Sequence, residues 1–408
     1  MQASLLWTTV KRRKGLDFRF SKQEQAFYEE VDEFLTKELP ERWSEECLYW
    51  PGGYGTIPDF EGLSPEAEQF RHKLADRGWL ALTWPKEYGG GGRSHMEQAI
   101  FQERLSYYRA PGPGVATLIA GPTILQFGSE ETKREWLPRI AKAEVRFWLA
   151  YSEPNAGSDL AAIQTSAVED GEYLIVNGQK SWSSGAHVSD YAWMLVRTNP
   201  SAPAHKGISL VILDNRSPGI SIRPLINICG FHSFNEVFFD NVRVPKRNIV
   251  GQRDRGWYYA MAALDYERLV VPIGNFKRTL EELVQWVKKE GLSQDILVKD
   301  RLAELAIEIQ IAYMFFWQTA CMLDKGLLPN IEASVFKLVA AELSRKLAHT
   351  AVTVMGHHGE LHPDVQWAPF RGRACIGYLD CISALVGAGS SEIQRNIIAA
   401  RGLGLPWA

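Results

Sequence analysis

The spacing of apolar residues changes twice along this sequence, and that change most limits the folds that the chain can adopt. Between residues 20 and 140, apolar positions recur every three or four residues, as in EQAFYEEVDEFLTKEL, with breaks at WPGGYGTIP, EYGGGG and APGPG. This spacing is typical of amphipathic helices separated by turns. Between about 148 and 251 the period shortens to that of strands, and from residue 257 the helical spacing returns. The sequence therefore predicts helices, then a compact β domain, then helices, without the alternating pattern of a parallel α/β sheet.

Two local signals give finer expectations within this order. Asn177-Gly178 lies between strand-like runs, and this dipeptide is a strong signal for a hairpin turn. Ser391 is followed three residues later by Gln394, which predicts a capping box at the start of the last helix.

Composition excludes several classes of protein. The 408 residues are 46% apolar and carry a net charge of -3, which argues against disorder and against a general nucleic-acid binder. No apolar run approaches the roughly 20 residues of a membrane helix. The basic cluster KRRK near the N-terminus is expected in a solvated extension rather than a transit peptide. The cysteines are odd in number and scattered, which favours a reducing compartment: Cys47, Cys229, Cys321, Cys375 and Cys381.

The usual nucleotide and metal motifs are missing. The sequence has no strand followed by GxGxxG and no GxxxxGK[ST], so neither a Rossmann domain nor a P-loop is predicted. The histidines of MGHHGELH, which are His357, His358 and His362, do not have the HExxH spacing. We expect them to be polar loop residues and expect no metal site.

A carboxylate interrupts the apolar stretch ALDYERLVVPIG, residues 263–274. Read at helical spacing, Glu267 falls on the same face as Ala260, Leu264 and Val271. An acid on a core-facing stripe needs either a cation to pair with or a chemical use. Pairing with Arg268 is unfavourable because adjacent helical residues point in different directions.

Three other stretches combine small, hydroxyl and aromatic residues. In YSEPNAGSDL (151–160), backbone amides of a Gly-Ser segment can approach a phosphate or a flavin closely. In QKSWSSGAH (179–187), Trp182 stands beside Ser183 and Ser184, which suits stacking on a flat cofactor. GAGSSEIQRNIIAARG (387–402) has two glycines before a helix start. Each stretch alone also fits a simple turn, core packing or an ordinary helix start.

Taken together and in this order, these stretches resemble the acyl-CoA dehydrogenase family over nearly the whole chain. The resemblance also includes FRFSKQEQAFYEEVDEFL, GWLALTWPKEYGGGG and EVFFDNVRVP. It implies an α+β multidomain protein with an N-terminal α-helical domain (17–147), a middle β-barrel-like domain (148–255) and a C-terminal helical bundle (256–408). It also implies FAD, an acyl-CoA substrate, electron-transfer flavoprotein as electron acceptor, a homotetramer and a cytoplasmic location, or the mitochondrial matrix in a eukaryote.

The resemblance assigns roles to individual residues. The positions matching flavin contacts are Tyr151, Ser152, Gly157, Ser158, Trp182 and Ser184, with Trp182 against the isoalloxazine and Ser184 near flavin N5. Ser158 also matches a position that contacts CoA. Asp265 and Arg268 match the pair that holds the pantetheine side of the substrate.

The family reaction removes a proton from the acyl α-carbon while the β-carbon gives a hydride to flavin N5, which yields a trans-2-enoyl thioester. Many members place the base before the Gly-Thr or Gly-Ser of the last motif, where this chain has Ala388. Others, including the isovaleryl and long-chain enzymes, place it just before the arginine of the middle helix, and that position is Glu267 here. We therefore expect Glu267 to be the general base, with Glu392 as the alternative.

Two departures from the family concern the adenosine half of the FAD site. Val287 and Glu290 stand where an Arg-x-x-Phe-Gly element is expected. Thr353 and His357 stand in place of the Gln and the second Gly of Gln-x-x-Gly-Gly-x-Gly. Three hypotheses follow: an active dehydrogenase, a weakly active or silent partner subunit of a hetero-oligomer with a paralogue, and a flavin oxidase or monooxygenase on the same scaffold.

Overall fold

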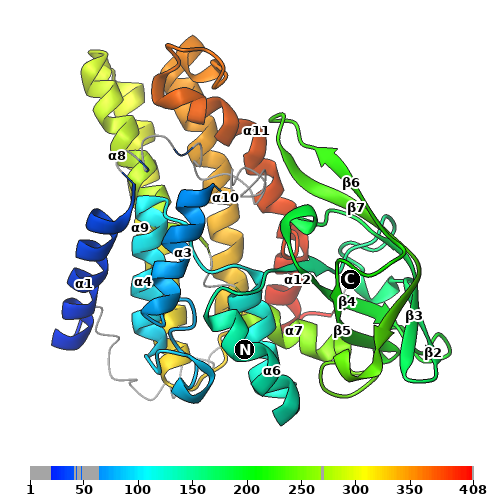
Figure 1. Ribbon diagram of the computed structural model, residues 1–408. Helices are drawn as coiled ribbons and strands as arrows, with labels where there is room; N and C mark the ends of the chain where they lie inside the picture. The colour runs from blue at the N-terminus through cyan, green and yellow to red at the C-terminus, as the bar shows by residue number, and fades with distance from the viewer. Residues whose placement is uncertain (1–19, 41–42, 44–46, 48–63, 268–270, 407–408) are drawn as a thin grey trace, which may run out of the picture.

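The computed structural model describes residues 20–40, 43, 47, 64–267 and 271–406, and for residues 264–267 it describes only the backbone. Helices and a curled sheet form two halves of the molecule, with the sheet to the right in Figure 1. The predicted order of helices, β domain and helices is confirmed.

Four of the five N-terminal helices that the structure describes begin at serines that cap them. Ser21 and Ser94 each accept from a backbone N–H three residues on, and Glu24 and Glu97 bond back to complete capping boxes. The buried faces of the first three of these helices meet around Phe27, which lies edge-on to Trp79. The helices are α1 (Lys22–Glu38), α3 (Pro65–Asp76), α4 (His95–Tyr108), α5 (Gly121–Phe127) and α6 (Glu130–Ala141).

The middle of the chain forms a seven-stranded sheet with the order β1-β4-β2-β3-β7-β6, and β5 pairs with β4. Alternate residues of the strands point into one apolar core that includes the fully buried Trp148, Val176 and Met194. This curled sheet is the expected barrel-like domain. The strands are β1 (Phe147–Ala150), β2 (Ser166–Asp170), β3 (Tyr173–Lys180), β4 (Tyr191–Arg197), β5 (Ile208–Asp214), β6 (Ile220–Ile226) and β7 (His232–Pro245).

The predicted hairpin turn at Asn177-Gly178 is wrong. Both residues lie within β3, and the β2–β3 turn is made at Gly171, which has φ +57°. Gly178 instead sits at a bulge opposite β7 with φ +148°, and a Cβ there would lie 2.8 Å from the Thr165 Cα. The glycine is therefore explained by a close approach of two backbones and not by a turn.

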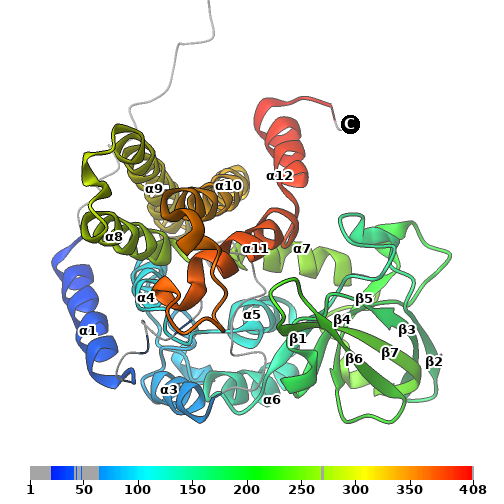
Figure 2. The ribbon, with the colours of Figure 1, turned by 90° about the horizontal axis from the view of Figure 1, so that it is seen from above.

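The C-terminal half is helical. Figure 2 shows α8, α9 and α10 side by side, and α7 between these helices and the sheet. Phe316 and Phe336 are fully buried where α9 and α10 meet. The helices are α7 (Gly256–Glu267), α8 (Ile273–Lys289), α9 (Ile296–Asp324), α10 (Asn330–Met355), α11 (Arg373–Val386) and α12 (Ser391–Ile397).

Two helix boundaries differ from the expectation. The helical reading of 263–274 is wrong at Val271 and Pro272, which lie outside α7 (Gly256–Glu267) and precede the start of α8 at Ile273. Pro272 accounts for the separation because proline disfavours a helical conformation in the residue before it. The cap of α12 is Ser390, whose hydroxyl accepts from the Ile393 N–H, and not Ser391.

One apolar stretch, Pro369–Gly402, satisfies the length and composition of a membrane-crossing helix, a test that core helices of soluble proteins also pass. The residues 387–390 divide it into α11 and α12.

Candidate functional site

The structure brings two of the predicted cofactor-binding segments side by side. Tyr151 and Ser152 follow the end of β1, and Ser181 and Trp182 follow the end of β3. The Ser181 N–H donates to the Ser152 carbonyl at 3.0 Å, so the two strand ends are hydrogen-bonded to each other. Tyr151 is buried beneath this pairing, whereas Ser152 is half-buried.

Trp182 is the most unusual side chain of this region. It is 65% exposed although its indole is large and apolar, and its backbone has φ 56°, in the left-handed region. Its ring meets Phe234 edge-on at 5.9 Å between centroids, which leaves its other surfaces free of that contact. Strained backbone and exposed aromatic surface both concentrate at ligand sites. This position is therefore suited to stacking on a flat ring.

Buried hydroxyls flank Trp182. Within the described part of the chain, the Ser181 and Ser183 hydroxyl oxygens are buried without a hydrogen-bond partner. Asn235 fixes this segment, since its carbonyl accepts from the Ser183 N–H at 3.0 Å and its Nδ2 donates to the Ser183 carbonyl at 2.9 Å. Ser184, the predicted hydroxyl near flavin N5, is half-buried in the next position. These residues fit a flavin.

The loop that carries Gly157 and Ser158 extends from the same strand end. Glu153 and Ala156 close a short bridge with two hydrogen bonds of 3.1 Å, and both Gly157 and Ser158 beyond it are exposed. A Cβ at Gly157 would meet no atom within 4 Å, and φ there is not positive. Neither crowding nor backbone conformation within the chain therefore requires glycine at position 157. The absence of a side chain there leaves space that a ligand can occupy.

A fully buried ion pair lies at the base of this loop. The Lys180 Nζ donates to the Glu153 Oε1 at 2.9 Å and to the Tyr151 carbonyl at 3.0 Å. The carboxylate also accepts from the backbone N–H groups of Gln164 at 2.7 Å and Thr165 at 2.9 Å. One charged pair thus connects the end of β1, the approach to β2 and the end of β3.

The cost of burying the charge is offset more fully for Glu153 than for Lys180. Burial lowers the pKa of Lys180 to about 8, although the charge of Glu153 opposes this shift. Burial alone would raise the pKa of Glu153, but Lys180 and the bonds from Thr165 and Gln164 outweigh it and lower that pKa. The difference arises because the carboxylate accepts three hydrogen bonds, whereas the ammonium has one charged partner and one carbonyl. We take both groups as charged at neutral pH.

Sequence reasoning missed this pair, although a signal for it exists. Leu174 and Val176 are buried at alternate positions of β3, and Lys180 is buried on the same strand after the bulge. A lysine whose position on a strand directs its side chain into the core needs a buried partner for its charge.

The predicted base lies at the C-terminal end of α7, where Glu267 is the last helical residue. One and two turns earlier, Ala263 and Ala260 are buried in the cluster that contains Trp84 and Ile119. The side chains of Asp265 and Glu267 and all of Arg268 lie outside the described residues. Their predicted roles stay predictions.

Ala388, at the alternative family position of the base, has a left-handed backbone conformation. Ala388 has φ 53° and Gly389 has φ +83°, and the Gln394 amide donates to their carbonyls at 3.5 and 3.2 Å. Glu392, the other carboxylate here, is exposed on the first turn of α12. Hydrogen bonds from its own backbone and from Ser390 lower its pKa. This is the opposite of the shift that favours a general base at neutral pH.

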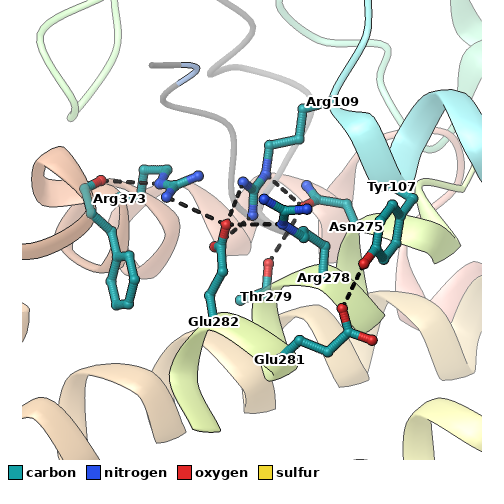
Figure 3. Close-up of polar contacts among 9 residues, drawn as sticks. Tyr107, Arg109, Asn275, Arg278, Thr279, Glu281, Glu282 and Arg373 are labelled. Atoms are coloured by element: carbon teal, nitrogen blue, oxygen red, sulfur yellow. Dashed lines mark hydrogen bonds and ion pairs between the residues drawn. The ribbon is translucent and has the colours of Figure 1, made fainter. Parts of the chain in front are cut away.

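A second buried network, also missed from the sequence, fixes the start of α8 (Figure 3). Arg109 at the end of α4 donates through Nε to the Asn275 Oδ1 at 3.0 Å and to Glu282 through both Nη atoms. Arg278 and Arg373 also contact this carboxylate, at 3.2 and 3.5 Å. Burial and the neighbouring Arg109 lower the pKa of Arg373 to about 10. Because α8 begins six residues after Glu267, this network anchors the chain that follows the predicted base.

The residues that depart from the family pattern lie at the C-terminal ends of α8 and α10: Val287 and Thr353 are in the helices, and Glu290 and His357 follow them. Val287 is buried, whereas Glu290, Thr353 and His357 are exposed. Within the described ranges, no three His, Cys, Asp or Glu side chains gather as metal ligands would.

Comparison with known proteins covers most of the chain. Residues 21–144, 149–242 and 254–403 match the models of the N-terminal, middle and C-terminal domains of acyl-CoA dehydrogenase. Acyl-CoA dehydrogenase FadE26 of Mycobacterium tuberculosis is 35% identical over 398 residues, which is 93% of this chain and 98% of that protein.

Two solved structures have similar folds. One, described as the Tcur3481-Tcur3483 steroid ACAD, has a TM-score of 0.88 at 29% identity and covers 96% of this chain and 100% of that chain. The ChsE4-ChsE5 complex from Mycobacterium tuberculosis has a TM-score of 0.85 at 32% identity, with the same coverage of 96% and 100%.

Proposed function

Because this chain belongs to the acyl-CoA dehydrogenase family, we propose that it dehydrogenates an acyl-CoA thioester to the trans-2-enoyl thioester with Glu267 as the base. Members of the family depend on FAD and act on CH–CH bonds of acyl-CoA substrates. The observation that carries the assignment of the base is the pair of positions 267 and 388. Glu267 lies on α7 one turn after the buried Ala263, and alanine occupies the other family position.

The proposed roles of the other residues follow from their places. Bound FAD supplies the hydride acceptor. Trp182, which is 65% exposed, would pack against its ring, Ser184 would lie near N5, and the strand ends joined by the Ser181–Ser152 hydrogen bond would border the ring. Gly157 and Ser158 form the exposed loop that meets the CoA moiety, and Asp265 and Arg268 hold the pantetheine.

General-base removal of the α-proton requires a carboxylate that stays ionised but is a strong enough base near neutral pH. A carboxyl group that is withdrawn from water has its pKa raised towards that range. A positioned base contributes about 10²–10⁴-fold to the rate. The weakly acidic α-proton of a thioester needs this help together with hydrogen bonds to the thioester carbonyl.

For the acyl group, we propose a bulky, steroid-derived chain. The support is the similarity to a structure described as a steroid ACAD. Straight and branched acyl groups are the alternatives, and electron-transfer flavoprotein is the proposed acceptor.

For the assembly, we propose an oligomer built through the outer face of α9. Ile307, Ile311 and Met314 lie on this helix at offsets of three and four and are 61%, 41% and 56% exposed. Burying such a stripe between subunits is favourable. A homotetramer is the family expectation. A hetero-oligomer with a paralogue is favoured by Glu290, Thr353 and His357, which replace adenosine contacts, and by the two-protein complex among the similar structures.

The decisive experiment is anaerobic titration of the purified, FAD-bound protein with straight, branched, cyclic and steroid-derived acyl-CoAs. We expect the flavin absorbance to bleach with at least one of them, and Glu267→Gln to bind the same acyl-CoA but bleach at least a hundredfold more slowly. Bleaching at the wild-type rate in Glu267→Gln would refute the assigned base. A flavin that no acyl-CoA reduces, alone or with a co-expressed paralogue, would favour the silent-subunit hypothesis, and rapid reoxidation by oxygen would favour an oxidase.

A further inference from the structure

The buried pair of Lys180 and Glu153 is the feature that the proposed chemistry leaves unused. Lys180 is 0% exposed, and none of the proposed contacts with FAD or CoA involves it. A buried charged pair is costly to form and is retained for specificity in some proteins. The contacts of this pair show what it can position.

Glu153 closes the loop of residues 154–163 at its base. Its carboxylate accepts from the N–H groups of Gln164 and Thr165, the two residues that follow the loop, while its own backbone precedes the loop. The residues that precede and follow the loop are thereby held together through one side chain. Gly157 and Ser158 lie in this loop.

Arg197 on β4 holds the returning limb of the same loop. Its guanidinium donates to the carbonyls of Ala161 at 2.6 Å and Ile163 at 3.0 Å. The loop is therefore fixed at its base by the anion Glu153, three residues after β1, and along its returning limb by the cation Arg197 of β4.

Lys180 connects this loop to residues 181–184, the ring-binding segment that contains Trp182. Its ammonium donates to Glu153 and to the Tyr151 carbonyl, and its backbone leads directly to Ser181, which pairs with Ser152, and to Trp182. A displacement of Lys180 would move both the indole of Trp182 and the base of the loop, because a hydrogen-bonded group in a packed interior transmits displacement.

We propose that the Lys180–Glu153 pair is a positioning device. It fixes the position of the ring-binding segment (residues 181–184) relative to the loop of residues 154–163, which is the proposed CoA contact. The pair touches neither ligand in this assignment and acts through Tyr151, Ser152 and the loop. The inference rests on the proposed function, since it takes Trp182 as the flavin contact and Ser158 as the CoA contact.

The test uses the double variant Lys180→Met/Glu153→Gln, which removes both charges and so leaves no unpaired buried ion. Glutamine keeps an oxygen that can accept from Thr165 or Gln164, and methionine keeps the length of the lysine stem. The matched control is Lys246→Met, which breaks a lysine–glutamate pair on the surface of the same domain, where Lys246 Nζ lies 2.6 Å from Glu169. Both variants are compared with the full-length FAD-bound protein.

Two dissociation constants are measured without turnover. FAD affinity is obtained from flavin fluorescence on reconstitution of the stripped protein, and CoA affinity from titration of the holoprotein with a non-reducible thioether analogue of acyl-CoA. We expect the double variant to fold and to lose at least tenfold in both affinities, with Lys246→Met within twofold of wild type. The single variant Lys180→Met is expected to lose more than the double variant, because it leaves the carboxylate without its counter-ion.

The proposal is overturned if the double variant keeps both affinities within twofold, and also if only one of the two affinities falls, because the pair would then not couple the two segments. These readouts do not depend on catalysis. A wild-type protein that binds FAD and the analogue but is not reduced by any acyl-CoA would refute the proposed function and leave this inference standing.

Discussion

Arg109 and Glu282 form a two-pronged ion pair although 173 positions separate them in the sequence. Nη1 donates to Oε1 at 2.9 Å and Nη2 to Oε2 at 2.8 Å, and the Arg109 side chain is fully buried. Two parallel bonds between planar groups fix orientation as well as distance. The pair therefore locks the end of α4 to the third turn of α8, with Arg373 of α11 beside it (Figure 3).

Glu282→Gln tests how much of the stability depends on this carboxylate. Removing one partner of a buried ion pair costs about 3–5 kcal/mol because the remaining charges lose their compensation. We expect a loss of about 3 kcal/mol in the free energy of unfolding, measured by urea denaturation with FAD in excess. Glu342→Gln is the control, since it pairs with the exposed Arg345 and Arg395 and should cost less than 1 kcal/mol. Equal losses in the two variants would contradict the role of the buried network.

Moving the base tests whether positions 267 and 388 flank the same substrate carbon. The double variant Glu267→Gln/Ala388→Glu should recover part of the flavin reduction lost in Glu267→Gln, on the order of tenfold or more. The new side chain adds no backbone cost beyond that of alanine, because Ala388 already has φ 53°. The measurement is the rate of anaerobic flavin bleaching by stopped flow. No recovery, with FAD and acyl-CoA binding intact, would mean that the two positions do not reach one α-carbon.

Lys180 should make stability rise with pH above neutrality. Its pKa falls from 10.5 in the unfolded chain to about 8 in the folded protein. Below pH 8 both states hold the proton and the cost of burial is present in full. Between about pH 8 and 10.5 the unfolded state binds more protons, so raising the pH favours the folded state, by about 3 kcal/mol at most.

The check is the free energy of unfolding of wild type minus that of Lys180→Met, followed from pH 7 to 10.5. Glu153 and Arg197, the charged neighbours of Lys180, keep their charges across this range. The difference should increase with pH through this window. A flat or falling difference would show that Lys180 is well compensated in the folded state.

Gly274 tests the packing of α8 on α4. Glycine-to-alanine changes within a helix ordinarily stabilise by about 1 kcal/mol. Here a Cβ would lie 2.1 Å from the Glu103 carbonyl oxygen and 2.7 Å from the Tyr107 nitrogen. Gly274→Ala is therefore expected to destabilise by about 1–3 kcal/mol through overpacking. Thermal and urea denaturation measure this loss. In the control Gly114→Ala, where a Cβ meets no atom within 4 Å, the change should stay within about 0.5 kcal/mol. Stabilisation by Gly274→Ala would contradict the close approach of the two helices.

The sequence by itself determined the order of helices, sheet and helices, because hydrophobic periodicity is a local property that each segment carries. It also determined the family, since motifs such as YSEPNAGSD and GQKSWSSG keep their identity and order without a structure. The place of Glu267 on a helix followed from the same local patterns.

Only the tertiary structure decided the features that depend on residues far apart in the chain. Asn177-Gly178 has the local chemistry of a turn but became part of β3, because Gly178 must accommodate the backbone at Thr165 and the pairing with β7. The partners of Lys180 and of Arg109 are set by how the strands and helices pack, and no spacing in the sequence encodes the meeting of residues 109 and 282. Periodicity specifies which face of an element is buried, whereas the partner that a buried charge finds there is fixed only when the elements come together.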